Sequence, residues 1–312
     1  MEIVRGVYNL RARHRGCVAT IGNFDGVHLG HQAVLGQLAE KGAQLRLPTV
    51  VVTFEPQPQE FFSAHAPSRL TRFREKVQAL RRFSVERVVC LRFNKKLADM
   101  AAQDFIQTLL VDGLGVRYLV VGDDFRFGHK RLGDFAMLQE AGARHGFEVV
   151  NMHTFSVADA RVSSTRVRTA LAQGDFATAE QLLGRPYRMS GRVAHGDKRG
   201  RDLGFPTANI HLHRKNAPLQ GVFAVEMFGI HGEPVAGAAN VGTRPTVGGT
   251  RCLLEVHLLD FNEDIYGCHV QVEFLHKLRD EVRYDSLDEL KNAIAGDCEQ
   301  ARAYFRKRVA SS

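Results

Sequence analysis

The first half of the chain alternates between short apolar runs and amphipathic stretches. The apolar runs have the length of buried strands, and we predict strands at 17–21, 50–54, 85–93, 118–122 and 147–153. Hydrophobic positions with helical spacing lie between these runs, at 31–42, 69–83, 104–110 and 134–144. Repeated strand, helix, strand units predict an α/β domain with a parallel sheet and helices on both faces. Ligands of such sheets bind beyond the carboxyl ends of the strands.

The pattern changes near Gly184, which together with Pro186 should end a helix that Asp175 caps. Strand-like runs then follow one another with turns between them, at YRMSGRVAH, GVFAVEMFGI, VAGAANVG, CLLEVHLLDF and HVQVEFLHKL. Consecutive strands without intervening helices predict an antiparallel barrel or sandwich.

Two helices should close the chain. The first begins at Ser286, with Glu289 in a capping box, and the second covers about 298–309. The change of pattern therefore predicts two domains, 1–184 and 185–312.

Composition sets limits on partners. At 312 residues and 44% hydrophobic, the chain can bury a full core and form two domains. A net charge of +8 would suit nucleic acid, but the basic residues are dispersed and tryptophan is absent. Small polyphosphate substrates account for the charge equally well, and we expect no nucleic-acid partner.

The sequence also indicates where the protein works. No apolar run approaches the roughly 18 residues that cross a bilayer, and the first residues, MEIVRGVYNLRARHRG, contain no apolar signal core. We therefore expect a cytoplasmic protein without membrane association. Five cysteines are scattered without a C-x-x-C pair, which favours free thiols over disulfides or a zinc site. Nothing in the sequence specifies the oligomeric state.

The segment TIGNFDGVHLGHQ, residues 20–32, passes from a strand to a helix. Gly22 permits a close turn, and His28 and His31 fall at the start of the helix, where free N–H groups and the dipole favour an anion. Two imidazoles there can donate hydrogen bonds to phosphoryl oxygens and stabilise the charge of nucleotidyl transfer. Two surface histidines are the alternative, and a metal pair is disfavoured because only Asp25 stands nearby at ligand spacing. We interpret the segment as a cradle for triphosphate.

Two other loops follow predicted strands. After 50–54, Pro56 and Pro58 forbid continuation of the strand and predict a rigid, extended loop. After 118–122, the loop GDDFRFGHKRLGD offers Phe125 and Phe127 to a planar heterocycle. The alternative for this second loop is an ordinary surface loop with both rings packed inward.

A second phosphate contact is predicted at VSSTRVRTAL, where Ser163, Ser164 and Thr165 precede a helix and Arg166 and Arg168 follow. Hydroxyls, free N–H groups and a guanidinium suit a phosphate. A plain N-cap with solvated arginines is the alternative.

The second half concentrates polar chemistry in HGDKRGRDLGFPTANI, residues 195–210. Its glycines and cations form a loop that can wrap a polyphosphate, although no Walker A sequence is present. Thr207 and Asn209 project on one side of an extended segment and offer hard oxygen ligands for magnesium, unless they serve a local turn. Glu255, in CLLEVHLLD, faces away from Leu254 and Val256 and is either a paired structural charge or a proton acceptor.

These motifs carry a family resemblance. GNFDGVHLGH, TFEPQP, GDDFRFG and SSTRVR occur in this order, and from about residue 1 to 309 the chain resembles the bacterial bifunctional riboflavin kinase/FMN adenylyltransferases, also called FAD synthetases. The resemblance implies a Rossmann-like nucleotidylyltransferase domain followed by a flavokinase-like barrel. It also implies two activities, phosphorylation of riboflavin to FMN and adenylylation of FMN to FAD, with riboflavin, FMN and ATP as the small-molecule substrates.

For adenylyl transfer, the resemblance assigns catalysis to His28 and His31. It places ATP beside Gly22, Asn23, Asp25, His28, His31, Ser164, Thr165 and Arg168. It places FMN beside Phe54, Pro56, Pro58, Asp124 and Phe127, although many members carry Asn where Asp124 stands.

For the kinase, the resemblance assigns the general base to Glu255. It places ATP beside Gly196, Lys198, Gly200, Arg201, Thr207 and Asn209. Thr207 and Asn209 would hold Mg²⁺ with the nucleotide. The run VGTRPTVGG also resembles a loop beside this site, with no role assigned to Arg244.

Two hypotheses from other classes remain. An H-x-G-H aminoacyl-tRNA synthetase would need a K-M-S-K-S-like loop and an RNA-binding appendage, and the sequence has neither. A flavin- or nucleotide-binding regulator that has lost one or both activities would lack His28, His31 or Glu255, and all are present.

Overall fold

The computed structural model describes residues 1–122, 124–152, 156–157, 160–195, 204–214, 216–246 and 249–310, with the backbone alone at 156–157, 244–246 and 249–251. The chain forms two compact units. The first comprises Met1–Pro67 and Thr71–Ser163, and the second comprises Ser68–Leu70 and Ser164–Ser312.

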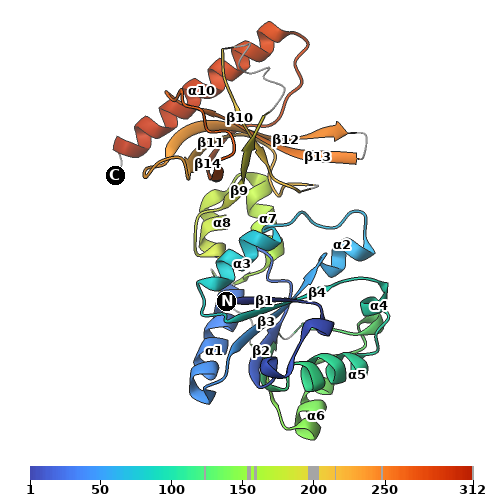
Figure 1. Ribbon diagram of the computed structural model, residues 1–312. Helices are drawn as coiled ribbons and strands as arrows, with labels where there is room; N and C mark the ends of the chain where they lie inside the picture. Colours follow the sequence, from blue (N-terminus) through green and yellow to red (C-terminus); the bar gives the residue numbers. More distant parts are fainter. Residues whose placement is uncertain are drawn as a thin grey trace. The chain divides into compact units, whose positions relative to one another are not determined.

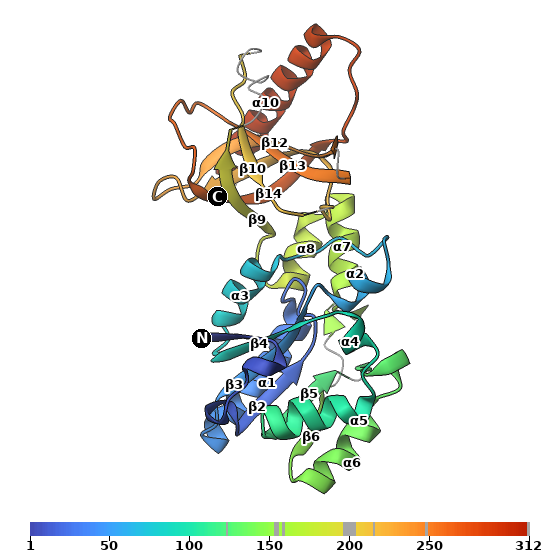
Figure 2. The same ribbon diagram turned by 45° about the vertical axis from the view of Figure 1, so that its right-hand side comes forward.

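The first unit contains a parallel sheet with the strand order β1-β4-β3-β2-β5-β6, of which Figure 1 labels β1 to β4 and Figure 2 labels β5 and β6. Its strands are β1 (Glu2–Arg5), β2 (Cys17–Ile21), β3 (Thr49–Glu55), β4 (Arg87–Arg92), β5 (Val116–Gly122) and β6 (Glu148–Met152). The predicted parallel sheet is confirmed. Strand β1 was not predicted, because its four residues carry too short a pattern. A small hairpin pairs β7 (Ser156–Val157) with β8 (Ala160–Arg161).

Helices cover both faces of this sheet, as predicted (Figure 1). The helices of this unit are α1 (Leu29–Leu45), α2 (Pro58–Phe62), α3 (Phe73–Arg81), α4 (Lys95–Ala98), α5 (Ala102–Phe105), the π-helix η3 (Ile106–Gly113) and α6 (Phe135–His145). Short 3-10 turns occur at η1 (Val7–Asn9), η2 (Ala12–His14) and η4 (His129–Arg131). Alternate strand residues enter opposite cores, because successive side chains of a strand point to opposite faces.

One core joins the sheet to α1 and α3, through Val18, Val51, Val88, Leu35, Leu38 and Leu80. The other core joins it to α5, η3 and α6, through Ala19, Val50, Val52, Phe105, Leu109 and Leu138. The two cores fix the sheet between its helices, so that the carboxyl ends of the strands form a stable edge.

Helix α1 differs from its prediction at both ends. It begins at Leu29, which makes His28 its N-cap, and it continues past Gly42 to a left-handed C-cap at Arg46. Gly42 does not end the helix. Its missing side chain is instead required for close packing. A Cβ at this position would lie 2.9 Å from the Thr49 side chain and 3.1 Å from the Leu47 carbonyl oxygen.

The second unit contains a closed antiparallel barrel with the order β10-β13-β12-β11-β14-β9. Its strands are β9 (Arg188–Ala194), β10 (Ala208–His211), β11 (Gly221–Phe228), β12 (Val235–Thr246), β13 (Gly249–Leu258) and β14 (His269–Arg279). The predicted barrel is therefore confirmed.

Helices α7 (Ser164–Gln173) and α8 (Phe176–Leu183) also belong to the second unit. Phe176 of α8 packs on the barrel residues Phe223 and Phe274, with ring centroids 5.8 and 6.3 Å away. Asp175 caps α8 and Gly184 ends it in the left-handed conformation, as predicted. The unit thus includes residues on both sides of the predicted boundary at 184/185.

A single helix, α10 (Leu287–Ala310), replaces the two predicted terminal helices and lies along the outside of the barrel (Figure 2). The predicted Ser286 cap is present, with the hydroxyl accepting from the Glu289 N–H at 3.2 Å. The helix continues through Gly296 because the next turns are held by the barrel. Asp297 receives two hydrogen bonds of 2.7 Å from Arg279, and Cys298 is buried.

All five cysteines are free thiols, as predicted. No helix in the described part of the chain has both the length and the apolar character needed to cross a membrane.

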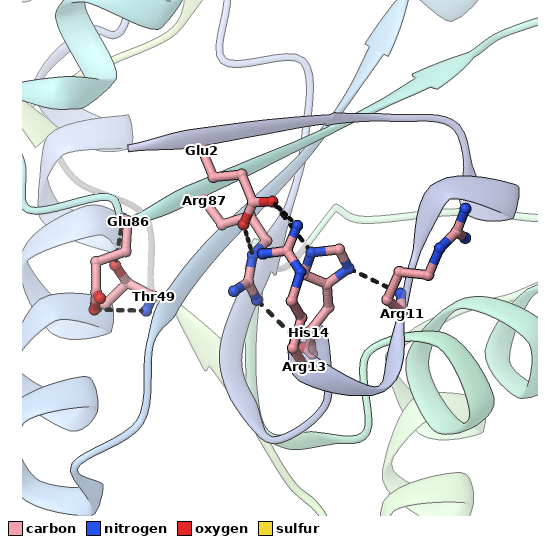
Figure 3. Close-up of polar contacts among 7 residues, drawn as sticks. All are labelled: Glu2, Arg11, Arg13, His14, Thr49, Glu86 and Arg87. Carbon is pink, nitrogen blue, oxygen red and sulfur yellow. Dashed lines mark hydrogen bonds and ion pairs between the residues drawn. The ribbon is translucent and has the colours of Figure 1, made fainter.

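A polar cluster secures the first strand of the sheet (Figure 3). The Glu2 carboxylate accepts hydrogen bonds from Arg13 at 2.8 Å, Arg87 at 3.1 Å and the almost fully buried His14 at 3.2 Å. His14 Nδ1 accepts from the Arg11 N–H at 2.9 Å, so its other nitrogen carries the proton given to Glu2. Desolvation alone would raise the pKa of Glu2, but these donors outweigh it and lower the pKa from 4.5 to about 2.

We expect Glu2→Gln to destabilise the first unit at pH 7 by about 1 kcal/mol, a value reduced for the partial exposure of the carboxylate. Because the folded pKa lies below the unfolded one, the stabilisation is fully present above pH 4.5 and disappears as the pH falls towards 2. Thermal unfolding of wild type and variant between pH 7 and 3 measures this. The exposed Glu40→Gln is the control, and a difference that grows on acidification would contradict the assignment.

Candidate functional site

The predicted cradle lies where strand β2 ends and α1 begins. His28 caps the helix, its Nδ1 accepting from the backbone N–H of His31 at 3.3 Å. The rings of His28 and His31 stack with their centroids 3.7 Å apart, and Phe24 lies 4.9 Å from His31. Because Nδ1 accepts this hydrogen bond, a single ring proton of His28 would lie on Nε2. The two histidines are brought together at a helix N-terminus, which favours an anion.

The site loop, residues 22–28, has an unusual backbone. Phe24 and Val27 have positive φ values of 48° and 45°, and Gly26 has 83°. A left-handed conformation is rare for a β-branched residue such as Val27, and such strain persists where the surroundings enforce it. Both Phe24 and Val27 are buried, so core packing holds the loop in this form.

Asp25 fixes the loop from inside. Its carboxylate accepts from the backbone N–H of Thr71 at 2.9 Å and from the Thr71 hydroxyl at 3.2 Å, and only 2% of the residue is exposed. The Thr71 hydroxyl also accepts from the Gly26 N–H at 3.0 Å. Asp25 thus shapes the loop around the histidines, and Thr71, which sequence reasoning missed, is its partner.

The surroundings of His31 lower its pKa. Burial, together with the charges of His28 and Lys76, holds the pKa of His31 well below its usual range. His31 Nδ1 and Asn23 Oδ1 are buried and have no hydrogen-bond partner among the described residues. A histidine whose pKa is lowered, together with buried polar atoms that have no described partner, is typical of a site prepared for a ligand.

Sequence reasoning also missed Lys76, although a signal was available. Lys76 lies on α3 four residues before the buried Leu80, on the apolar face of the helix. A charged residue at such a position is unusual unless its environment compensates for burial.

Aromatic rings surround the loop that follows β3. Phe54 is buried and lies 5.9 Å from Phe93. Phe61 and Phe62, which the sequence did not single out, also contact Phe93, and 69% of Phe62 is exposed.

The course of this loop differs partly from its prediction. Strand β3 ends at Glu55, and the Glu55–Pro56 bond is cis. The predicted extended loop is wrong beyond Gln57, because Pro58 begins the short helix α2. A proline at the first turn suits helix initiation.

In the loop after β5, which was predicted to bind flavin, one candidate residue is exposed and the other is buried. Asp124 is exposed and forms an ion pair with Arg161 at 2.9 Å. Phe127 is only 7% exposed and packs in the core against Phe105 and Phe125, at 5.5 Å from each. The ring of Phe127 therefore supports the loop from within.

The SSTRVR residues lie at the start of α7, where sequence reasoning placed them. Ser164 opens the helix, Thr165 is exposed, and the Arg168 Nε donates to the carbonyl oxygen of Ser68 at 2.6 Å. Ser164, Thr165 and Arg168 belong to the second compact unit, whereas His28 and His31 belong to the first.

The barrel brings three polar residues into one row. Glu255 on β13 pairs directly with Asn209 on β10 and with Asn240 on β12. Directly paired residues of antiparallel strands share a face, with Cβ atoms about 5 Å apart. Leu254 and Val256 are fully buried on the opposite face, as the predicted alternation requires.

Thr207 stands at the end of this row. The Asn209 amide nitrogen donates to the Thr207 carbonyl oxygen at 3.5 Å. A cavity of about 270 Å³ opens beside Thr207, lined also by Pro206, Val256 and the loop 261–266. The His257 ring bonds the Pro206 carbonyl oxygen at 2.9 Å and so holds this segment against β13.

Four predicted ATP ligands of the kinase, Gly196, Lys198, Gly200 and Arg201, lie outside the described residues. Within the described part of the chain, no cluster of three or more His, Cys, Asp or Glu side chains is arranged to hold a metal. The hydroxyl and amide oxygens of Thr207 and Asn209 are hard donors of the kind that Mg²⁺ prefers, and Glu255 lies beside Asn209 on the neighbouring strand. This donor set fits a magnesium ion that takes its remaining ligands from phosphate and water.

Comparison with known proteins matches two different parts of the chain. A family model for FAD synthetase matches residues 10–166, and one for riboflavin kinase matches residues 183–305. Proteins named bifunctional riboflavin kinase/FMN adenylyltransferase are similar over nearly the whole length. The one from Escherichia coli (strain K12) is 53% identical over 98% of both chains, and the one from Pseudomonas fluorescens is 53% identical over 97% of both.

One solved structure is similar over almost the whole chain. It is described as a macrolide-efflux protein from Streptococcus pneumoniae and is 30% identical, with a TM-score of 0.80 over 97% of this chain and 99% of that one.

Proposed function

The chain belongs to the bifunctional riboflavin kinase/FMN adenylyltransferases, and from this premise we propose that its two reactions have separate active sites. Residues 1–184 would transfer AMP from ATP to FMN, and residues 185–312 would phosphorylate riboflavin. The observation that carries the proposal is that each compact unit has its own polar cluster, His28 with His31 in one and Thr207, Asn209 and Glu255 in the other. The comparisons give no support to the alternative of a regulator without activity.

In adenylyl transfer, an oxygen of the FMN phosphate attacks the α-phosphorus of ATP, and pyrophosphate leaves as the bond to the β-phosphate bridge breaks. The nucleophile is already an anion, so no general base is needed and catalysis rests on positioning and charge stabilisation. His28, with its Nδ1 engaged by the helix, donates through Nε2 to the phosphates. Neutral His31 stacks against it and keeps its ring in place.

The remaining candidate residues would either shape this site or bind its two substrates. Gly22, Asn23 and Asp25 would shape the ATP side of the loop. Ser164, Thr165 and Arg168 would bind phosphate at the start of α7. The flavin would lie near Phe54, Pro56, Pro58, Asp124 and Phe127. Because Phe127 is buried, its part is to hold the loop that carries Asp124.

In the kinase reaction, Glu255 accepts the proton of the riboflavin 5′-hydroxyl as that oxygen attacks the γ-phosphorus of ATP, and ADP leaves. Thr207 and Asn209 would hold Mg²⁺, which neutralises phosphate charge when bound. Gly196, Lys198, Gly200 and Arg201 would complete the ATP site. The cytoplasmic location expected from the sequence is part of the proposal.

A product assay tests the proposal. The protein is incubated with riboflavin, ATP and magnesium, and FMN and FAD are separated over time. FMN should appear first and FAD should follow after a lag, and omission of magnesium should abolish both. Formation of neither flavin nucleotide, or of FAD without any FMN, would reject it.

A further inference from the structure

Lys76 is a fully buried cation. None of its surface is exposed, and it is among the largest fully buried side chains of the chain. Transfer of an ammonium group from water into a protein core is costly unless its surroundings compensate. Its Nζ donates a hydrogen bond of 3.3 Å to the hydroxyl of Thr53, near the end of β3. A charge retained in this position requires a reason beyond packing.

The hydrogen bond connects Lys76 to the site loop. The Thr53 hydroxyl in turn donates to the carbonyl oxygen of Asn23 at 3.4 Å. Lys76, Thr53 and Asn23 therefore form a continuous chain from helix α3 through the sheet to the loop. Asn23 also carries a buried side-chain oxygen, Oδ1, that has no hydrogen-bond partner among the described residues.

The same helix holds the loop at a second point. Thr71, which binds both Asp25 and Gly26, lies just before α3 begins at Phe73. The charge of Lys76 also reaches His31, where it acts with burial and His28 against protonation. The loop is thus held at two points: Thr71, just before α3, binds Asp25 and Gly26, and Lys76 on α3 reaches Asn23 through Thr53.

We propose that Lys76 is a positioning residue of the adenylyl-transfer site, whose ammonium group holds Thr53 and the backbone of Asn23 so that His28 and His31 meet the triphosphate in the reactive geometry. This inference rests on the proposed function of the first unit. Lys76 is too deeply buried to contact substrate in this arrangement, and its fixed positive charge lies behind the loop that receives a polyanion. It acts on the reacting atoms through the loop.

Lys76→Met tests the role, because it keeps the length of the side chain and removes the charge. We expect the kcat for FAD formation from FMN and ATP to fall about ten- to hundred-fold, the effect of a small misplacement of reacting groups. The KM for FMN should stay within about two-fold, since Lys76 does not touch the flavin. Lys76→Arg should recover a large part of the lost rate, and Arg81→Met, at an exposed position of the same helix, should have no effect.

Riboflavin phosphorylation by the same protein serves as the internal control and should stay at the wild-type rate. Retention of FAD formation by Lys76→Met would overturn the proposal. So would an equal loss of both activities, or a Lys76→Arg variant as slow as Lys76→Met.

If Lys76→Met does not fold, the Thr53→Val variant tests the proposed role of Lys76. This variant removes the bridging hydroxyl with little change of shape, and a kcat for FAD formation equal to wild type would reject the role. A wild-type protein that makes no FAD from FMN and ATP would instead refute the proposed function itself.

Discussion

Glu255→Gln is expected to lower the kcat of riboflavin phosphorylation about a thousand-fold, within the range of a lost general base. Glutamine keeps the shape and polarity of the side chain beside Asn209 and Asn240 but cannot accept the hydroxyl proton at neutral pH. FAD formation from added FMN should continue at the wild-type rate. Initial rates of FMN formation at saturating ATP measure the effect.

Glu226→Gln is the matched control for this variant. Glu226 lies on the same barrel and pairs with Arg308 at 3.2 Å, away from the row around Glu255. It should leave phosphorylation unchanged. A Glu255→Gln enzyme within a few-fold of wild type would show that another group accepts the proton.

His28→Ala is expected to lower kcat/KM for FAD formation about a hundred- to thousand-fold, the usual effect of a lost donor to developing charge. Riboflavin phosphorylation should not change. The substitution also removes the N-cap of α1, which costs about 1 kcal/mol of stability. Rates with FMN and ATP, measured beside thermal unfolding, follow both effects.

His28→Asn separates the two roles of this residue. Asparagine is a good N-cap and restores an acceptor for the His31 N–H, but it lacks the imidazole donor. We expect it to recover the stability and to leave FAD formation impaired. Recovery of activity by His28→Asn would reduce the role of His28 to helix capping.

Periodicity was sufficient to predict the parallel sheet and an antiparallel second half, whereas the choice of a barrel over a sandwich came from the family resemblance. The buried runs of β2, β3 and β5 read directly as parallel strands, and the change at Gly184 marked the antiparallel half. Element ends were harder to predict, because they depend on packing. Gly42 looks like a helix stop, yet its missing Cβ serves contact with Thr49, and Gly296 lies inside a helix that the Asp297–Arg279 pair holds to the barrel.

Some residues of the candidate sites could be predicted from a local sequence segment, and others depend on the fold. His28 and His31 could be found from one short segment, because their spacing and the adjoining strand are local. Asn240 could not, because its pairing with Glu255 depends on the register of β12 and β13. Lys76 was visible as a charge on an apolar helix face, but its link to Asn23 through Thr53 needs the fold.

Complementation between two inactive variants tests the central claim most directly. Glu255→Gln should make no FAD from riboflavin, and His28→Asn should stop at FMN. If the sites are separate and act in series, a mixture of the two proteins with riboflavin, ATP and magnesium will form FAD after a lag in which free FMN accumulates. A mixture that forms no FAD because the FMN stays bound to the His28→Asn protein, although Glu255→Gln alone converts added FMN, would contradict transfer of free FMN between the sites. A Glu255→Gln protein that cannot convert added FMN would contradict their independence.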